Sequence, residues 1–125
     1  MRRGRSTSAP TKTQAARIEA VKLGPCMACM ILVERGELER HKADGPCDYH
    51  HLKSGNIRRG HDYGIGLCGW HHRQLVDWAH THADMREAYG PSLMDGSRRF
   101  REVFGSDDDL LERQNKLLEQ GDWCD

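Results

Sequence analysis

Two short motifs of metal-ligand residues constrain this chain more than any other feature of its sequence. Cys26-x-x-Cys29 and Cys68-x-x-His71 are separated by 38 residues. Zinc prefers four tetrahedral Cys and His ligands, which proteins usually supply from two short turns. A spacing of two residues lets both side chains of one turn reach the same ion, so we expect these four residues to form a structural Cys3His zinc site. Such a site contributes directly to the folding of a small domain.

The composition explains why the chain would need a metal. Its 125 residues are 37% hydrophobic and 30% charged, with three Trp, three Tyr and two Phe. A core built from so few large side chains is thin, and small domains with thin cores usually need a metal or disulfides. We expect a single domain over residues 15–125, preceded by a disordered basic arm over residues 1–14.

The five cysteines indicate metal binding because the protein is expected to be cytoplasmic. The basic N-terminus is not followed by the apolar stretch of a signal peptide. No apolar run approaches the roughly 20 residues that span a bilayer, so no membrane partner is expected. Cytoplasmic thiols usually bind metals or act in catalysis rather than form disulfides. Cys47 lies outside the two motifs and could replace one ligand, serve a second zinc or be an ordinary buried cysteine, and Cys124 is expected to be a bystander.

Charge is distributed unevenly along a chain whose formal net charge is zero. Residues 1–22 are predominantly basic and residues 106–125 predominantly acidic. This asymmetry is typical of a nucleic-acid-binding protein with one positive surface, although two solvated ends without function would give the same pattern.

Hydrophobic patterning predicts an α+β fold in which a strand pair leads into a helix. The apolar, β-branched run over 30–33 favours a short strand. Ser97 and Ser106 are candidate helix caps, each followed by apolar residues at helical spacing. The expected elements are a helix over 15–23, strands over 30–33, 47–52 and 63–67, a basic turn over 53–60, and helices over 68–80, 97–105 and 106–121.

Four histidines form a second group of candidate functional residues. Adjacent strand residues point to opposite faces, so His50 and His51 cannot both be idle packing at low cost. A hairpin that returns into the following helix can bring both of them around one point with His61 and His72. Phosphodiester hydrolysis needs a base of near-neutral pKa, which histidine supplies, and a divalent ion on the phosphate oxygens. The nearby residues that could hold DNA phosphates are Lys53, Arg58, Arg59 and Arg73.

Together these residues resemble the HNH, or His-Me finger, endonuclease superfamily. The resemblance rests on the Cys26 motif, on His50-His51-Leu52 and on Leu67-Cys68-Gly69-Trp70-His71-His72-Arg73. Residues 23–118 more narrowly resemble the phage recombination-enhancement nuclease Ref, whose family is described as RecA-dependent HNH nucleases. The resemblance implies an α+β fold with a small zinc-stapled ββα-metal core and additional C-terminal helices.

The resemblance also implies a role for each histidine. His50 and His72 would hold the catalytic ion, expected to be Mg²⁺ or Mn²⁺, beside the structural Zn²⁺. His51 would be the general base that activates water. The implied activity is metal-dependent hydrolysis of DNA phosphodiester bonds in recombination. The implied partners are DNA and the RecA filament, and the implied location is the cytoplasm of a bacterial host if the protein is phage-encoded.

The middle position of the superfamily motif departs from the usual pattern. That position is usually Asn, and it orients the base. His61 and Asp62 are the candidates for it here, and His61 is favoured. Asn56 is a weaker candidate because it lies too near the first strand.

A binding protein without catalytic activity is the main alternative. A zinc ribbon with a basic arm could bind DNA and cut nothing, with the histidines as packing residues or ligands of a second structural zinc. A pure interaction protein that docks through its acidic tail and its leucine-bearing last helix is a third interpretation, which leaves the histidines unexplained. An open metal position distinguishes a catalytic site from a structural one.

Overall fold

The molecule is described from a computed structural model that covers residues 9–54, 57–77 and 79–120. This part of the chain contains six α-helices and two small antiparallel sheets, each of two strands. The expected α+β class is therefore confirmed. Within the same ranges, no helix has the length and apolar character that crossing a membrane requires.

A two-stranded sheet lies at the centre of the fold. β1 (Asp48–His51) pairs antiparallel with β4 (Gly64–Leu67), so that Asp48 lies opposite Leu67 and His51 opposite Gly64. Both strands agree with the expected ones to within one residue at each end. All four residues of β4 are buried, which explains why its sequence is apolar or glycine throughout.

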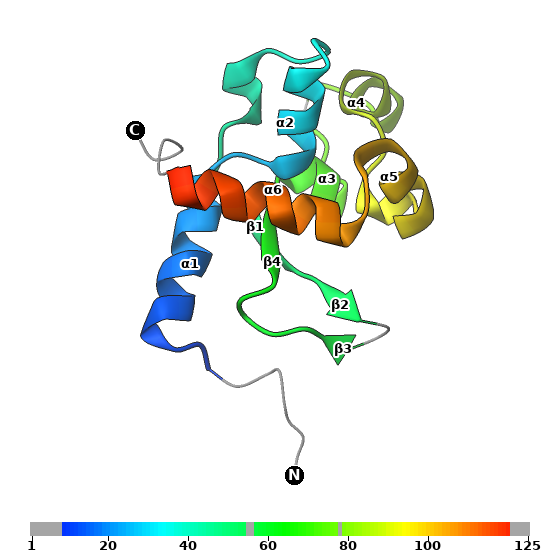
Figure 1. Cartoon of the computed structure of the whole chain (residues 1–125). Helices are drawn as coiled ribbons and strands as arrows, with labels where there is room; N and C mark the ends of the chain where they lie inside the picture. Colours follow the sequence, from blue (N-terminus) through cyan, green and yellow to red (C-terminus); the bar gives the residue numbers. More distant parts are fainter. Residues whose placement is uncertain (1–8, 55–56, 78, 121–125) are drawn as a thin grey trace.

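The second sheet is a short hairpin that extends from the end of the first. β2 (Lys53–Ser54) pairs with β3 (Ile57–Arg58), and all four residues are exposed. This hairpin occupies the segment that the sequence predicted as a basic turn. In Figure 1 it extends away from the helices at the same end of the molecule as the start of α1 (Lys12–Leu23).

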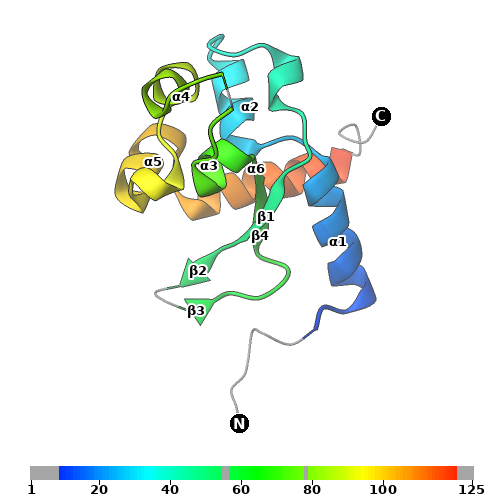
Figure 2. The same ribbon diagram turned by 180° about the vertical axis from the view of Figure 1, so that it is seen from behind.

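Helices cover both sides of the central sheet. α6 (Asp107–Gln120) crosses in front of β1 and β4 in Figure 1, and the view from behind in Figure 2 places α3 (Gly69–Arg73) on the opposite side. α1 packs along both strands, and α2 (Met27–Glu34) contacts both β4 and α6. The core cluster of buried apolar side chains joins α2, this sheet, α5 and α6, and it includes Met27, Leu67 and Phe104.

Side chains from two helices close the outer edge of β4. The Gly66 amide donates a hydrogen bond to Gln114 Oε1 of α6 over 2.9 Å, and Gln114 is only 2% exposed. Arg17 Nη2 of α1 donates to the Gly64 carbonyl oxygen, also over 2.9 Å. An unpaired strand edge presents unsatisfied backbone groups, so these two side chains satisfy polar groups that a third strand would otherwise pair.

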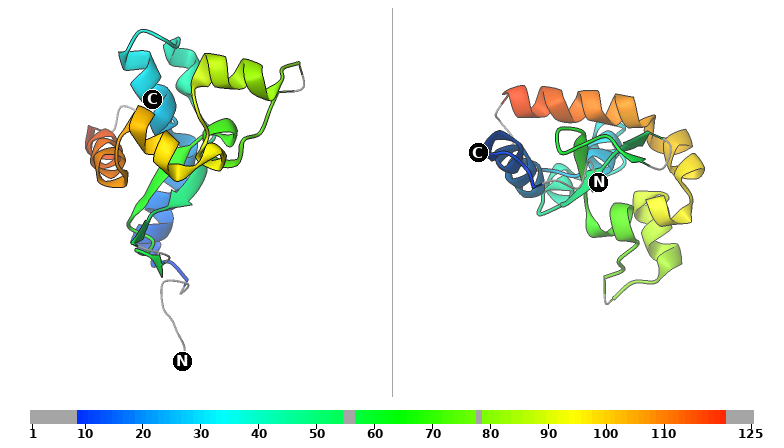
Figure 3. Two further views of the ribbon diagram at one scale, coloured as in Figure 1. Left: turned by 90° about the vertical axis from the view of Figure 1, so that its right-hand side faces the viewer. Right: turned by 90° about the horizontal axis from the view of Figure 1, so that it is seen from below.

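The remaining helices form a group beside α3. It consists of α4 (His82–Tyr89), the short helix η3 (Leu93–Asp95) and α5 (Ser97–Phe104), which Figure 3 shows together at one side of the molecule. A second short helix, η2 (Arg40–Ala43), lies against α2 in the charged segment between α2 and β1.

The expected strand over residues 30–33 is wrong, because these residues belong to α2. A short apolar run does not distinguish a buried strand from a buried helix. Here Cys26 decides the outcome: its Sγ accepts a hydrogen bond from the Cys29 amide at 3.4 Å and caps the helix, and the apolar residues that follow are buried on several sides.

The expected helix over residues 68–80 is also wrong in its length. α3 ends at Arg73, and Gln74 adopts a left-handed conformation with φ of 60°. A separate helix, α4, begins at His82, where Thr81 and Asp84 form a capping box. Left-handed residues end helices, and this one redirects the chain after a single turn.

The structure corrects one expected helix start and one expected helix cap, and it confirms a second cap. α1 begins at Lys12, because Thr11 and Gln14 form a capping box, so residues 12–14 belong to a helix and not to the basic arm. Ser97 is the first residue of α5, and Gly96 occupies the cap. Ser106 caps α6 as expected, with Asp109 as its partner. Residues 1–8 of the expected arm and Cys124 lie outside the described residues.

Candidate zinc centre and active site

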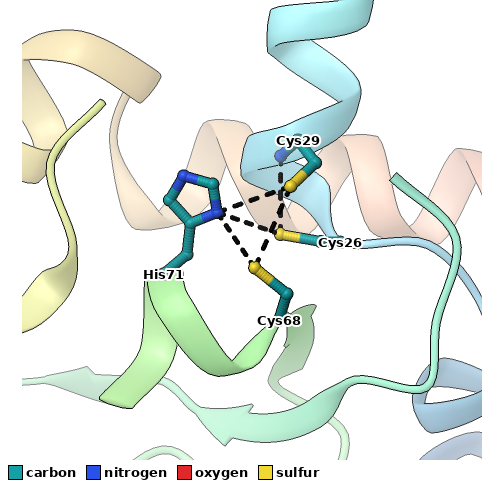
Figure 4. Close-up of side chains that lie close together, drawn as sticks. All are labelled: Cys26, Cys29, Cys68 and His71. Carbon is teal, nitrogen blue, oxygen red and sulfur yellow. Dashed lines mark hydrogen bonds between the residues drawn. The ribbon is translucent and has the colours of Figure 1, made fainter. Parts of the chain in front are cut away.

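Two helix N-termini bring the four residues of the Cys and His motifs together. Cys26 and Cys29 lie at the start of α2, and Cys68 and His71 lie at the start of α3. Figure 4 shows the three sulfurs and the His71 ring converging on one point. Their ligand atoms all lie within 4.8 Å of one another. Among the described residues no other group of three or more such side chains meets this criterion.

The distances in this cluster fit a tetrahedral zinc ion. With Zn–S of about 2.3 Å and Zn–N of about 2.0 Å, a tetrahedral ion holds two sulfurs about 3.8 Å apart and a sulfur and a nitrogen about 3.5 Å apart. The Cys29 and Cys68 sulfurs are separated by 3.9 Å. His71 Nδ1 lies 3.5 Å from the sulfurs of Cys26 and Cys29 and 3.2 Å from that of Cys68. The cluster could therefore hold zinc without rearrangement.

The surroundings of His71 prepare it as a ligand. Its Nε2 donates a hydrogen bond to the Tyr89 carbonyl oxygen over 2.8 Å, which leaves the Nδ1 lone pair directed at the three sulfurs. Metal-binding histidines usually donate their second ring nitrogen in this way, which fixes the tautomer and the ring orientation. The ring is fully buried and lies edge-on to Phe104, with 5.2 Å between the ring centroids. The α4–α5 group thus supports the cluster from outside.

The three cysteines of the cluster shift one another's pKa values in different directions. Burial raises the pKa of Cys26 well above its usual range, and hydrogen bonds with Cys26 and Cys68 raise the pKa of Cys29. Hydrogen bonds from Cys26 and Cys29 lower the pKa of Cys68. Three thiolates in one buried pocket repel one another, and a coordinating divalent cation removes that repulsion because it deprotonates its thiol ligands.

Cys47 is an ordinary buried cysteine in this structure. Its Sγ donates a hydrogen bond to the Gly24 carbonyl oxygen at 3.4 Å, and burial raises its pKa to about 12. It does not belong to the four-residue cluster, so of the three roles left open by the sequence the structure favours packing.

One face of β1 carries His50 and Asp48, and both contact His72 of α3. Alternate strand residues share a face, which places Asp48 and His50 together. His72 Nδ1 donates to Asp48 Oδ2 over 2.9 Å, and the rings of His50 and His72 lie 5.1 Å apart between centroids. Arg73 Nε also donates to Asp48 Oδ2, over 2.7 Å. Because its Nδ1 proton is donated to Asp48, a neutral His72 carries its lone pair on Nε2.

Electrostatics favours a neutral His50 and a charged Asp48 on this face. Burial, together with His72, lowers the pKa of His50 to about 4, so His50 is neutral near pH 7. Partial burial raises the pKa of Asp48, but the hydrogen bonds from His72 and Arg73 outweigh it and the net shift is downward. Metal binding requires a histidine ligand to be neutral, as His50 is. A carboxylate that accepts a hydrogen bond from the second ring nitrogen of a ligand, as Asp48 does from His72, fixes the orientation of that ring.

The other face of β1 carries Tyr49 and His51. His51 Nε2 lies 3.3 Å from Nδ1 of His61, which follows the β2–β3 hairpin, and the two ring centroids are 5.4 Å apart. The Tyr49 ring lies edge-on to the His51 ring, with 5.1 Å between centroids. Burial and the nearby Arg58 lower the pKa of His51, which keeps it neutral as a base must be. The contacts thus join the four histidines as two pairs, one on each face of β1.

The four basic candidates have different surroundings. Lys53 and Arg58 are exposed and face each other across the hairpin. Arg59 forms an ion pair with Asp108 of α6 over 2.7 Å, and Arg73 is engaged by Asp48. Lys53 and Arg58 are therefore the better placed of the four to meet a phosphate. His80 and His82, for which the sequence indicates no role, are exposed.

Three residues near the histidine pairs were not singled out by the sequence patterns. Asp48 contacts His72, Tyr49 contacts His61, and Arg17 contacts Tyr49. A signal for Asp48 was present, because a carboxylate two positions before a strand histidine shares its face. No local pattern pointed to Tyr49 or Arg17, since their contacts depend on packing between α1 and β1. Gln14 Nε2 donates to Asp62 Oδ2 over 3.0 Å, so Asp62 is held by α1 and not by His51.

The fold and the site together define a small α+β protein with a four-residue cluster of zinc-ligand type and paired histidines on its central strand. The family model described as "Recombination enhancement, RecA-dependent nuclease" matches residues 10–119. The chain belongs to this family, and the narrower resemblance found in the sequence is confirmed. No curated protein matches the chain. The family description indicates a nuclease, and membership of the HNH superfamily stays a prediction.

Proposed function

We propose that this protein is an HNH-type endonuclease that hydrolyses DNA phosphodiester bonds with one divalent ion, in recombination that depends on RecA. Its ββα core would consist of β1, β4 and α3. The observation that carries the proposal is the distribution of histidines on β1. His50 contacts His72 on one face, and His51 contacts His61 on the other. A metal-binding pair and a base with its orienting residue would thus start from adjacent positions of one strand.

His50 and His72 would hold the catalytic ion through neutral ring nitrogens. Asp48 supports this role because it accepts the hydrogen bond from His72 Nδ1 and fixes that ring. A bound Mg²⁺ or Mn²⁺ would polarise the phosphate and stabilise the leaving oxygen. Two imidazoles leave positions for water and phosphate oxygens, as a catalytic ion requires, and they would also accept Zn²⁺ or Ni²⁺.

His51 would take a proton from the attacking water. In the proposed arrangement its Nε2–H donates to His61 Nδ1, so that the Nδ1 lone pair of His51 accepts the proton. His61 would hold the ring in this tautomer, the role that the superfamily usually gives to an Asn. The amide oxygen of an Asn has two acceptor lone pairs, whereas a neutral imidazole has only one on its ring. The orientation of the His61 ring therefore matters more than that of an amide would.

Lys53 and Arg58 would hold the phosphates of the DNA strand beside the base. They lie opposite each other on exposed strands, where like charges repel unless an anion lies between them. Arg58 is close enough to His51 to lower its pKa, which places a cation near the proposed base. Contacts with DNA phosphates fix the position of the DNA and carry little sequence information.

Nicking of supercoiled plasmid tests the proposal. The purified protein is incubated with Mg²⁺ or Mn²⁺, with and without RecA filaments on single-stranded DNA. We expect nicking that requires a divalent ion and that RecA stimulates. DNA binding without cutting under any ion would overturn the proposal in favour of the zinc-ribbon DNA-binding protein.

The Asp48→Asn substitution tests the metal-binding face. The amide keeps the size of the side chain but loses the charge that holds His72 and Arg73. We expect the Mn²⁺ concentration for half-maximal nicking to rise by about 10- to 100-fold, the usual effect of losing a carboxylate behind a metal-binding histidine. The zinc content is expected to stay unchanged.

The matched control for this variant is Asp44→Asn. Asp44 is also paired with an arginine, Arg40, but both side chains are exposed and neither contacts a histidine of the two pairs. We expect its Mn²⁺ dependence to equal that of the wild type. An unchanged Mn²⁺ requirement in Asp48→Asn would show that Asp48 does not support a metal ligand.

A further inference from the structure

We propose that Tyr49, held by Arg17, is a positioning residue that fixes His61 against His51. This inference rests on the proposed nuclease function and extends it to residues outside the HNH motif. Tyr49 lies two positions before His51 in β1, and the two side chains therefore share one face of the strand. Its hydroxyl donates a hydrogen bond to the His61 carbonyl oxygen over 2.5 Å, and its ring lies edge-on to His51. Tyr49 therefore contacts both members of the pair that would contain the base.

The Tyr49 hydroxyl contacts the turn that carries His61. His61 lies between the exposed strand β3 and the buried strand β4, directly after Gly60, whose φ is +122°. The Tyr63 amide donates to the Gly60 carbonyl and closes the turn. The Tyr49 hydroxyl bonds the backbone of this turn at His61 itself, and so it fixes the backbone position from which the His61 side chain extends.

Gly64 makes room for the Tyr49 ring. A Cβ on Gly64 would lie 2.2 Å from Cε2 and Cζ of Tyr49, a distance that real side chains do not tolerate. The ring therefore lies directly over the start of β4. Any side chain at position 64 would displace Tyr49 from this place and with it the hydroxyl that reaches His61.

Arg17 of α1 fixes the hydroxyl from the other side. Its Nε donates to the Tyr49 oxygen over 3.1 Å, and its Nη2 donates to the Gly64 carbonyl over 2.9 Å. With Arg17 as its donor, the Tyr49 hydroxyl directs its own proton to His61. These hydrogen bonds join α1, β1, β4 and the His61 turn around the buried Tyr49 side chain.

A double-mutant cycle of Tyr49→Phe with His61→Ala tests the proposal. Phenylalanine keeps the ring over Gly64 and removes only the hydroxyl. We expect kcat for plasmid nicking to fall by about tenfold, because small displacements of catalytic groups cost up to about 100-fold. KM for DNA, the zinc content and the melting temperature are expected to change little. In the His61→Ala background, Tyr49→Phe is expected to have no further effect, because Tyr49 acts through His61.

Two further variants sharpen this test. Tyr63→Phe removes a hydroxyl from the same turn, on a side chain that is 44% exposed, and is expected to retain the wild-type kcat. Arg17→Met is expected to lower kcat in the same direction as Tyr49→Phe, and the two together are expected to be no worse than Tyr49→Phe alone. If Tyr49→Phe fails to fold, Arg17→Met carries the same comparison with His61→Ala.

A wild-type kcat in Tyr49→Phe would overturn the inference, and so would an equal loss in the wild-type and His61→Ala backgrounds, which indicates a purely structural role. Nuclear Overhauser contacts between the rings of His51 and His61 provide a readout that needs no activity. They are expected in the wild type and weakened in Tyr49→Phe. Unchanged contacts would overturn the positioning role even if the protein cuts no DNA, whereas absent cutting alone would contradict only the proposed nuclease function.

Discussion

Replacing His51 with Ala is expected to reduce DNA cleavage by about 1,000-fold while leaving the fold, the zinc content and DNA binding intact. A positioned general base contributes roughly 10²- to 10⁴-fold to the rate of such a reaction. The half-buried His51 ring lies at the end of β1 and belongs neither to the buried core nor to the Cys3His cluster. The measurement is the single-turnover rate of plasmid nicking, beside fluorescence anisotropy with labelled DNA for binding.

His80→Ala is the matched control for this experiment. His80 is an exposed histidine whose Nδ1 lies 3.9 Å from Asp77 Oδ2, and it belongs to neither histidine pair. We expect this variant to cut at the wild-type rate. If His51→Ala also cuts at that rate in a preparation free of contaminating nuclease, His51 is not the base.

Replacing Cys29 with Ser is expected to destabilise the protein more than any substitution at the histidine pairs. The substitution removes one of four zinc ligands from a position that is 1% exposed, and apparent binding free energies for structural zinc reach about 10–16 kcal/mol. We expect the free energy of unfolding to fall by at least about 3 kcal/mol, and the melting temperature by about 10 °C or more. Calorimetry and metal analysis of the purified protein measure the two effects.

Cys47→Ser separates the loss of a ligand from the loss of a buried thiol. Cys47 is also buried, but its sulfur donates to the Gly24 carbonyl and lies outside the cluster. We expect this variant to keep its zinc and to lose much less stability, because Ser can donate the same hydrogen bond. A Cys29→Ser protein that melts like the wild type and binds zinc normally would contradict the structural role of the cluster.

Local patterns in the sequence were sufficient for several features of this protein. The spacing of Cys26-x-x-Cys29 and Cys68-x-x-His71 selected the four residues that the fold brings within 4.8 Å of one another. Both central strands and the cap of α6 at Ser106 followed in the same way. Ligand spacing, strand alternation and capping depend on residues only a few positions apart, so the sequence expresses them directly.

Other features depended on contacts between distant segments, and only the tertiary structure decided them. The apolar run over 30–33 is helical because the fold buries α2 on several sides, and this burial cannot be derived from the run itself. The histidines form two pairs rather than one cluster because α3 brings His72 against His50 on one face of β1, and the segment after β3 brings His61 against His51 on the other. Arg17 reaches Tyr49 and Gly64 across 32 and 47 residues of chain. Such contacts arise from how helices pack on a sheet, which depends on the whole fold. The spacing of residues along the chain, by contrast, is set within each segment.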